Sequence, residues 1–344
     1  MTIEVEGVDG RFPRVPESEV WCGNAGTATR FLLAAIALCS GPRGEECPRG
    51  QERPRGGAVT LRGVSRMHQR PQGPLIAALR SLGVRVTTLG QSDTCLPLRV
   101  TTLTEHVRAD GVAIADGSVS SQFASALLMC APHVSKDRPF RVSVPLGAVS
   151  LSYVRLTVSL MRRFGVTVTD SVTEGEHVFT VSPGGYENPE VVTVEADAST
   201  GTYALALGAL LRPTRVHGVG GASRQGDAQF ARFLRLLGAT GVTVSADSVT
   251  VAPIDQTVID QTLIDQTAMD KTVMDRTGVD QSDGTNDGDG FACETVRADD
   301  GTVVISADFE PMTDAFLTAC VVAACALPSH VSVRLRGIAN QRVK

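Results

Sequence analysis

The sequence predicts an α/β protein built from repeated βαβα-type units. Three segments combine an apolar-periodic helix, a glycine and an alternating strand, and a helix rich in small residues precedes each of them. Hydrophobic residues make up 42% of the chain but aromatic residues only 4%, so the core must consist mainly of Ala, Val and Leu. Such a composition suits closely packed helices that cover strands of β-branched residues.

The three helix–glycine–strand segments are residues 74–86, 154–168 and 228–244. In each segment, apolar residues recur at three- and four-residue spacing, which marks one buried helix face. Gly83, Gly165 and Gly238 are expected to end these helices, because glycine takes the left-handed conformation after a helix without strain. An alternating Val-x-Val strand then follows each glycine.

The small-residue helices are expected to start at Thr27, Ser121, Thr200 and Thr313. Ser and Thr at these positions supply acceptors for the unpaired backbone donors of a helix start. The four starts lie 94, 79 and 113 residues apart, as in a repeated unit with insertions. The fourth unit lacks its closing helix, glycine and strand, so we expect the chain to be cut at its C-terminus.

Two stretches fall outside the repeat. Residues 41–57 are rich in Pro, Gly and Arg and predict a surface loop. Residues 252–290 repeat the phrase Ile-Asp-Gln-Thr with variants and contain nine Asp against Lys271 and Arg276. A period of five could also fit a small β-coil, but so few turns would bury little core, so a disordered acidic insertion is the preferred interpretation.

Charge and composition exclude several classes of function. The net charge is −5, and the acidic stretch alone accounts for −7; the remaining charge is far from the basic bias of a nucleic-acid binder. No apolar run is long enough to cross a bilayer and no signal peptide opens the chain, so we expect a soluble, cytoplasmic protein. The eight cysteines form no C-x-x-C pair and no Cys/His metal spacing, which predicts buried thiols and no metal site.

Two glycine- and arginine-containing motifs suit an anionic ligand. Gly23-Asn-Ala-Gly26-Thr27 runs directly into a helix, whose free N–H groups favour an anion, although a plain capped helix would look similar. Arg70, in RMHQRP, could bind a carboxylate or phosphate with both arms of its guanidinium. The alternative for Arg70 is a solvated side chain that caps a turn.

Two further motifs place polar groups at helix starts. The cluster Asp116–Gln122 offers hydroxyls and an amide, which suit a phosphorylated polyol or simply form an N-cap. Asp314 is expected in the first turn of an apolar helix, where the helix dipole favours its charged form; a capping role is the alternative.

Eight motifs in a fixed order resemble the 5-enolpyruvylshikimate-3-phosphate synthase family, namely GNAGTATR, RMHQRP, DGSVSSQFASALLMCAP, SLSY, EADAST, RQGDAQF, EPMTDAFLTA and GIANQRVK. The last two are most similar to the synthase domain of the fungal pentafunctional shikimate-pathway polypeptide. The resemblance implies two lobes, each made of βαβαββ units, with residues 1–190 forming most of one lobe and residues 191–344 part of the other.

The resemblance also implies a reaction without metal or cofactor. The family transfers the enolpyruvyl group of phosphoenolpyruvate to the 5-hydroxyl of shikimate 3-phosphate and releases phosphate. The implied partners are these two small molecules and other shikimate-pathway domains, with no nucleic acid and no membrane.

The site residues are carried over from the family motifs, position by position. The shikimate 3-phosphate contacts correspond to Ser120, Ser121, Gln122, Ser150, Tyr153, Asp314, Asn340 and Lys344. The phosphoenolpyruvate contacts correspond to Gly26, Arg70 and Gln122. Asp314 and Lys344 match the catalytic positions, with Asp314 taking the hydroxyl proton, and supporting positions correspond to Asn24, Thr27, Arg30 and Asp197.

Departures from the family pattern predict little or no activity for this chain alone. The Lys-Ser pair that precedes GNAG in the family has no counterpart in residues 1–22, and further cationic positions would follow residue 344. Leu151 and Ser152 stand where the family usually has a basic or amide residue and Pro. The alternatives are an inactive fragment or relic of the synthase and, less favoured because of the Ser-Ser-Gln cluster, a transferase acting on UDP-N-acetylglucosamine; an RNA-end cyclase lacks support because the catalytic His motif is absent.

Overall fold

The computed structural model describes residues 17–39, 58–101, 112–134, 138–148, 150–173, 175–255, 257, 291–297, 300 and 302–338. These residues divide into two compact units. Unit 1 contains the described residues up to Ala148 and Tyr153–Glu190, and unit 2 contains residues 150–152 and those from Val191 onward. The predicted loop 41–57 lies outside the described residues.

Unit 1 contains the repeated unit twice. The first copy consists of β1 (Glu17–Trp21), α1 (Gly26–Cys39), β2 (Ala58–Arg62), α2 (Gly73–Ser81), β3 (Arg85–Thr88) and β4 (Leu98–Thr101). The second consists of β5 (Val112–Ile114), α3 (Gln122–Val134), β6 (Phe140–Pro145), α4 (Leu151–Arg163), β7 (Val168–Thr173) and β8 (Glu176–Val181). Both copies therefore have the order βαβαββ, which confirms the predicted repeat and the strand expected after Gly83 and Gly165.

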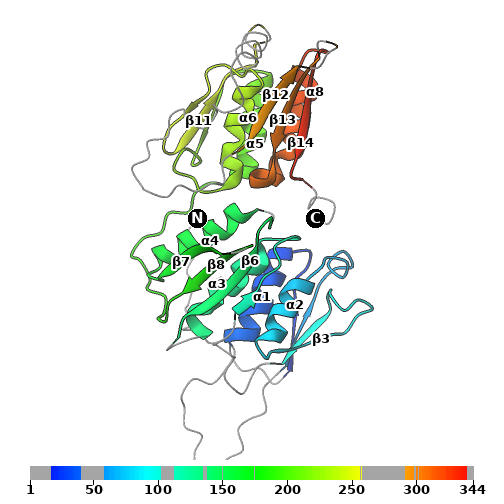
Figure 1. Ribbon diagram of the computed structural model, residues 1–344, viewed down its shortest axis with the longest axis vertical. Helices are drawn as coiled ribbons and strands as arrows, with labels where there is room; N and C mark the ends of the chain where they lie inside the picture. The colour runs from blue at the N-terminus through cyan, green and yellow to red at the C-terminus, as the bar shows by residue number, and fades with distance from the viewer. Residues whose placement is uncertain are drawn as a thin grey trace, which may run out of the picture. The chain divides into compact units, whose positions relative to one another are not determined.

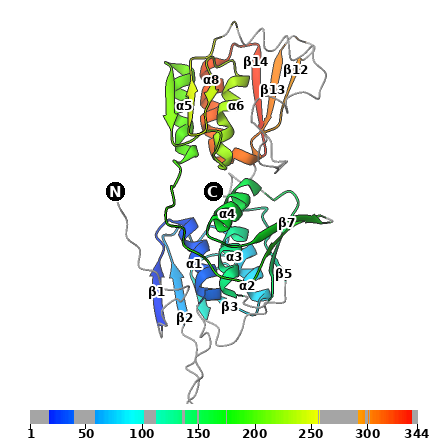
Figure 2. The same ribbon diagram turned by 90° about the vertical axis from the view of Figure 1, so that its left-hand side faces the viewer.

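The two sheets of unit 1 share one topology. Their strand orders are β1-β2-β4-β3 and β5-β6-β8-β7. In each sheet the first pair is parallel and the other two pairs are antiparallel. Helices α1, α2 and α3 lie between the two sheets (Figure 2) and contact one another. The starts of α1 and α3 consequently come together inside the unit.

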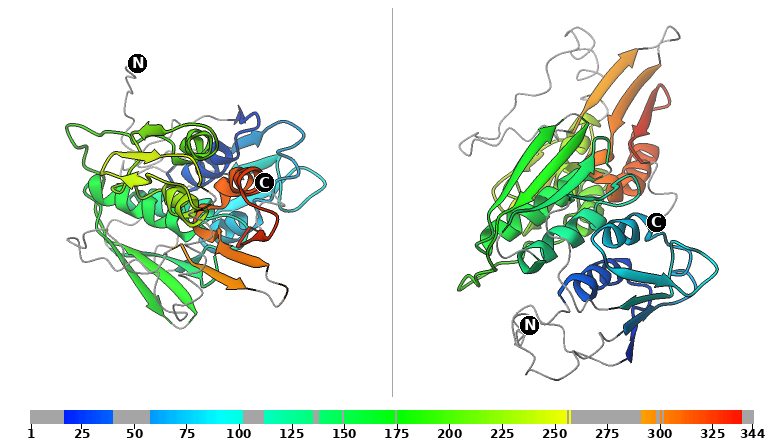
Figure 3. Two further views of the ribbon diagram at one scale, coloured as in Figure 1. Left: turned by 90° about the horizontal axis from the view of Figure 1, so that it is seen from above. Right: turned by 60° about the horizontal axis from the view of Figure 1, so that its bottom comes forward.

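Unit 2 contains further, partial copies of the same pattern (Figure 1). Its first elements are α5 (Ala198–Leu210), β9 (Thr214–His217), the 3₁₀ helix η1 (Gly226–Gln229), α6 (Phe230–Leu236), β10 (Thr243–Val244) and β11 (Ser248–Val251). Its later elements are β12 (Cys293–Arg297), β13 (Val303–Asp308), the 3₁₀ helix η2 (Glu310–Ala315), α8 (Phe316–Ala326) and β14 (Val331–Arg336). The sheet orders are β10-β11-β9 and β12-β13-β14, and Figure 3 shows the orange and red strands of the second sheet side by side.

An aromatic cluster lies in the core of unit 2, next to the start of η2. Phe230, Phe233 and Phe309 are fully buried, and the ring of Phe233 lies 5.1 Å from that of Phe309. Phe291 packs edge-on against Phe233 and Phe309 at 6.4 and 6.0 Å. Phe309 directly precedes η2, so its packing in the core fixes where η2 begins.

Glycines end three of the helices, as predicted. Gly83, Gly165 and Gly238 have φ values of 91°, 79° and 83°, in the left-handed region that glycine adopts without strain. The chain turns at each glycine and continues toward β3, β7 and β10.

The expected starts of two small-residue helices were wrong. Helix α5 begins at Ala198 and is capped by Asp197, whose carboxylate accepts from Ser199 N, because Asp at the position before the helix is itself a good acceptor for its free N–H groups. Helix α8 begins at Phe316 rather than at Thr313. Met312 has φ −135° and ψ 48°, a conformation that separates the 3₁₀ turn from the α-helix.

The predicted acidic insertion begins later than residue 252. Ile254 forms a β-bridge with Ala239, and its N–H donates to Ala209 O at 2.8 Å. These bonds make residues 252–255 part of the fold of unit 2. Residues 258–290 lie outside the described residues. Within the described part of the chain, no helix is both long and apolar enough to span a bilayer.

Candidate functional site

Arg30 joins two of the predicted motifs in unit 1. It lies near the start of α1 and only 7% of it is exposed. Its Nη1 atom donates to Ser120 Oγ at 3.0 Å and to Gln122 Oε1 at 2.8 Å. Its guanidinium also lies 5.1 Å from the centre of the Phe123 ring, a distance at which a cation is attracted to the aromatic face. The motifs that begin α1 and α3 therefore form one site.

Gln122 completes this network at the first residue of α3. Its Nε2 atom donates to Thr27 Oγ1 at 3.0 Å, and its backbone N–H donates to Ser120 Oγ at 3.3 Å. Ser121 is buried, and its carbonyl accepts from Ser125 N at 3.2 Å. The side chains of Ser120 and Gln122 thus belong to the site together with Thr27, whereas Ser121 lies deeper in the fold.

Arg70 lies against the start of α1. A Cβ atom at Gly26 would come within 2.7 Å of Arg70 Nη1, so the absence of a side chain at Gly26 is what admits the guanidinium. Burial and, second, the charge of Arg70 lower the pKa of Arg30 to about 10, which leaves Arg30 protonated at pH 7. In the part of the chain that the structure describes, no carboxylate pairs with either guanidinium.

These features favour negative charge at the start of α1. Two guanidinium groups that lack a carboxylate partner repel one another, and a bound anion would remove that repulsion. The Nε atoms of both arginines are buried, and neither has a hydrogen-bond partner among the described residues. The free N–H groups at the helix start add to the favourable field for negative charge.

A second group of predicted residues comes together in unit 2. Ser150 has a left-handed backbone, with φ 57°; its N–H donates to the Glu310 carboxylate, and its Oγ lies 3.5 Å from Thr313 Oγ1. Ser152 Oγ donates to Pro311 O at 3.3 Å. The SLSY and EPMTDAF motifs are therefore in direct contact. Ser152, which departs from the family pattern, contributes one of these bonds.

Asp314 follows this contact directly but lies in the 3₁₀ helix η2 and not, as expected, in the first turn of the apolar helix α8. It is exposed and belongs to η2, while Ala315 is the residue that precedes α8 and makes no side-chain capping bond. Pro311 starts the 3₁₀ turn and Met312 leaves the helical path, so the helix begins after Asp314. The arrangement presents the carboxylate at the surface of unit 2.

The remaining predicted residues are spread more widely. Asn24 is exposed in the turn before α1, and Tyr153 is half-buried on α4. Asp197 caps α5, because its carboxylate accepts from Ser199 N at 3.1 Å and from Thr200 Oγ1 at 2.6 Å. Asn340 and Lys344 lie outside the described residues.

Gly226 was missed as a functional residue by the sequence reasoning. A Cβ atom there would collide with the carbonyl of Pro311 and lie 3.0 Å from Ser152 Oγ. The following Asp227 is 1% exposed, and its carboxylate accepts from Ser199 Oγ. Gly226 lies in the motif RQGDAQF, which the sequence analysis noted. Its role is steric and does not depend on a left-handed φ, so the sequence alone does not reveal the contact that it permits.

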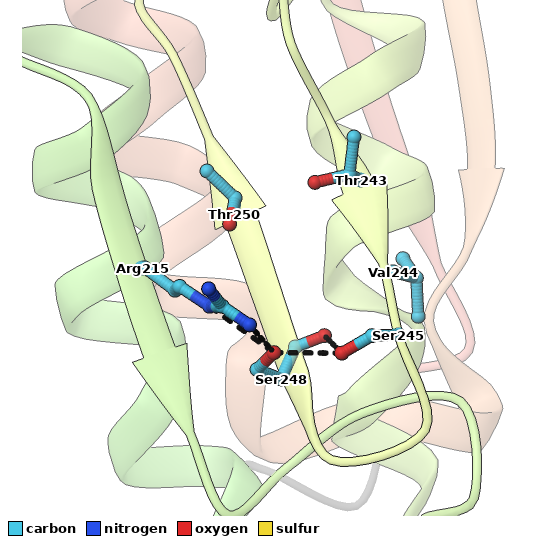
Figure 4. A pocket seen from close by; sticks show the side chains of 6 residues that line it. All are labelled: Arg215, Thr243, Val244, Ser245, Ser248 and Thr250. Atoms are coloured by element: carbon cyan, nitrogen blue, oxygen red, sulfur yellow. Dashed lines mark hydrogen bonds between the residues drawn. The ribbon is translucent and has the colours of Figure 1, made fainter.

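A shallow pocket of about 200 Å³ lies on the sheet β10-β11-β9 (Figure 4). Arg215 Nη2 donates to Ser248 Oγ at 2.9 Å, and Ser248 Oγ lies 2.7 Å from Ser245 Oγ. None of the predicted site residues lines this pocket. It is therefore separate from both groups of candidate residues.

The amino-acid sequence matches the model of one protein family. The family model described as EPSP synthase (3-phosphoshikimate 1-carboxyvinyltransferase) matches residues 1–344. A pentafunctional AROM polypeptide of Candida glabrata is 35% identical over 351 residues, which cover 100% of this chain and 18% of that protein. A 3-phosphoshikimate 1-carboxyvinyltransferase of Bordetella petrii is 43% identical over 236 residues, which cover 67% of this chain and 48% of that protein.

The match to these curated relatives extends over less than half of their own lengths. Among solved structures, an EPSP synthase of Acinetobacter baumannii aligns with 68% of this chain and 47% of that chain, at 18% identity and a TM-score of 0.48.

Proposed function

Because the chain belongs to the EPSP synthase family, we propose that it serves the transfer of the enolpyruvyl group from phosphoenolpyruvate to the 5-hydroxyl of shikimate 3-phosphate. The observation that carries this proposal is the pair Arg30 and Arg70 at the start of α1, with no carboxylate partner in the described part of the chain. Both substrates are anions with phosphate and carboxylate groups, which guanidinium groups bind with both arms.

Each group of residues has a proposed ligand. Gly26, Arg70 and Gln122 are assigned to phosphoenolpyruvate. Ser120, Ser121, Gln122, Ser150, Tyr153, Asp314, Asn340 and Lys344 are assigned to shikimate 3-phosphate. The hydroxyls and amide of Ser120 and Gln122 suit a phosphorylated polyol, and the network that holds them supports a preformed site.

Asp314 is the proposed general base. It would accept the proton of the 5-hydroxyl while the oxygen attacks C2 of phosphoenolpyruvate and the methylene carbon gains a proton. Loss of a proton from that carbon then restores the double bond as phosphate leaves. The exposed position of Asp314 beside the Ser150–Thr313 contact suits a base that must reach a bound hydroxyl. Lys344 is proposed as the second catalytic group.

The proposal can be tested with the purified chain and both substrates. Phosphate release is measured together with the dissociation constants of shikimate 3-phosphate and phosphoenolpyruvate. We expect both ligands to bind, any phosphate release to require both, and Asp314→Asn to lower the rate by a larger factor than it weakens binding of shikimate 3-phosphate. The rate of phosphate release by the unsubstituted chain tests the prediction that this chain alone has little or no activity. If neither substrate binds at millimolar concentration, the proposed function is wrong.

Partners and compartment are also proposals. The similarity to pentafunctional AROM polypeptides supports attachment to, or association with, other shikimate-pathway domains. A cytoplasmic location is supported by the cysteines, because no disulfide joins any two of those in the described residues, as is usual in a reducing compartment.

A further inference from the structure

Arg30 differs from Ser120, Gln122 and Thr27 because it can only donate hydrogen bonds. A guanidinium has five N–H donors and no acceptor. With a pKa of about 10, it keeps this character throughout the neutral range. The two hydrogens of Nη1 are directed to Ser120 Oγ and Gln122 Oε1. Both of these atoms must therefore act as acceptors.

This constraint fixes the orientation of the Gln122 amide. The oxygen and nitrogen of a glutamine amide are nearly identical in shape, so their hydrogen bonds alone decide which way the group faces. Arg30 holds the oxygen at 2.8 Å, and the nitrogen consequently faces Thr27, to which it donates at 3.0 Å. The second N–H of the amide has no acceptor among the described residues.

The same reasoning applies to the two hydroxyl groups. Ser120 Oγ accepts from Arg30 and from the backbone N–H of Gln122, so its own hydrogen points elsewhere. Thr27 Oγ1 accepts from Gln122, and no described residue accepts its hydrogen. Thr27 is exposed, while Ser120 and Gln122 are half-buried. The second N–H of Gln122 and the hydroxyl hydrogens of Ser120 and Thr27 therefore remain available to a ligand.

We propose that Arg30 is a positioning residue that orients Gln122, so that the free hydrogen-bonding group of this amide is an N–H donor rather than its carbonyl oxygen. A group that can only donate favours ligand atoms that accept, such as phosphate and carboxylate oxygens, over hydroxyl groups that need an acceptor. The assignment of the ligand as shikimate 3-phosphate rests on the proposed function, whereas the orientation of the amide does not.

The orientation is tested by NMR of the whole chain labelled with ¹⁵N-glutamine. The side-chain amide signal of Gln122 is identified by its loss in Gln122→Ala. We expect Arg30→Gln to move this signal toward that of a solvent-exposed amide, and Arg30→Lys, which keeps the positive donor, to restore most of the shift. The matched control is Arg162→Gln, because Arg162 also donates two hydrogen bonds, to Val168 O at 3.2 and 2.7 Å. A Gln122 signal unchanged by Arg30→Gln would overturn the proposal.

Binding gives a second, independent measurement. The dissociation constant of shikimate 3-phosphate is determined for wild type, Arg30→Gln, Gln122→Ala and the double variant. We expect Arg30→Gln to weaken binding roughly tenfold in the wild-type background but far less in the Gln122→Ala background, because Arg30 acts through that amide. Equal effects in both backgrounds would overturn the inference while leaving the proposed function intact.

A variant that leaves Arg30 in place covers the case in which Arg30→Gln does not fold. Gln122→Glu keeps an acceptor for Arg30 but removes both amide N–H groups, so binding should weaken by at least tenfold although the pair with Arg30 is kept. Wild-type affinity in Gln122→Glu would contradict the donor role. If the wild-type chain binds no shikimate 3-phosphate, the proposed function fails, and the NMR comparison alone decides the role of Arg30.

Discussion

Gly226 lies so close to the carbonyl of Pro311 that no side chain fits between them. The glycine begins η1 and the proline lies in η2, the segment that carries Asp314. The φ of Gly226 is not in the left-handed region, so its importance is steric rather than conformational. The RQGD motif therefore acts as a support for the segment that presents the proposed base.

Gly226→Ala should destabilise unit 2 and displace Asp314. The added methyl meets backbone, which cannot rotate away, so η1 and η2 must separate. Overpacking of this kind costs about 1–3 kcal/mol, and we expect a loss in that range or above in urea unfolding.

The matched control is Gly221→Ala in the loop that precedes η1. A Cβ atom there would lie 3.5 Å from Ser245 O, an ordinary contact, so stability should change by less than about 0.5 kcal/mol. Equal stability of the two variants would contradict the steric role of Gly226.

Gly26→Ala should weaken the proposed phosphoenolpyruvate site without unfolding the protein. The new methyl would lie 2.7 Å from Arg70 Nη1, and the long Arg70 side chain can move aside. We expect a change in unfolding free energy below about 1 kcal/mol but a roughly tenfold rise in the dissociation constant of phosphoenolpyruvate, since one charge-assisted contact is lost. Calorimetric titration measures the second value, and an unchanged constant would show that Arg70 does not bind this ligand.

The sequence was sufficient to predict the repeat because its signals are local. Gly83, Gly165 and Gly238 mark helix ends by backbone conformation alone, and the Val-x-Val strands follow within a few residues. The grouping of the GNAG and SSQ motifs came from the family resemblance, since Arg30 and Gln122 are 92 residues apart. No periodicity in the chain could indicate that contact.

What the sequence could not predict depends on tertiary packing. The role of Asp197 as the cap of α5 follows from where that helix begins, and helix boundaries are uncertain by a residue or two in any sequence pattern. The place of Ile254 in the fold depends on its bridge with Ala239. Ser152 departs from the family pattern, but its hydroxyl donates to Pro311 O. That bond joins two segments far apart in the sequence, so the sequence alone could not predict it.

Phe309→Ala should be among the most destabilising substitutions in unit 2. The ring is fully buried between Phe233 and Phe291, and removing a buried aromatic ring costs about 3–5 kcal/mol through lost burial and the cavity left behind. Val296→Ala, at a position that is 52% exposed on β12, serves as the control and should cost less than about 1 kcal/mol. Urea unfolding of both variants tests the difference, and similar losses would contradict the packing argument.

The cysteines should differ strongly in their reactivity toward an alkylating reagent. The prediction of buried thiols was wrong for Cys320 and Cys325, which are exposed on α8. Cys130 is buried, and its pKa is raised, first by a hydrogen bond with Cys39 and then by burial. Only the thiolate reacts, so Cys320 and Cys325 should be labelled first and Cys130 last in native protein at about pH 8. Peptide mass spectrometry of timed samples measures this order, and early labelling of Cys130 would contradict the structure.

The raised pKa of Cys130 also predicts how stability changes in alkali. An unfolded cysteine loses its proton near pH 8.5, while folded Cys130 still holds it. Above that pH the folded state binds more protons than the unfolded state, so the free energy of unfolding falls as pH rises. Below about pH 8 both states are protonated and the contribution of Cys130 is fully present. Cys130→Ala should therefore reduce the fall in unfolding free energy between about pH 8 and 10, whereas Cys325→Ala, at an exposed position, should leave it unchanged. Urea unfolding across this pH range measures the slope for each variant. Identical slopes in wild type and Cys130→Ala would show that this thiol is not the group responsible.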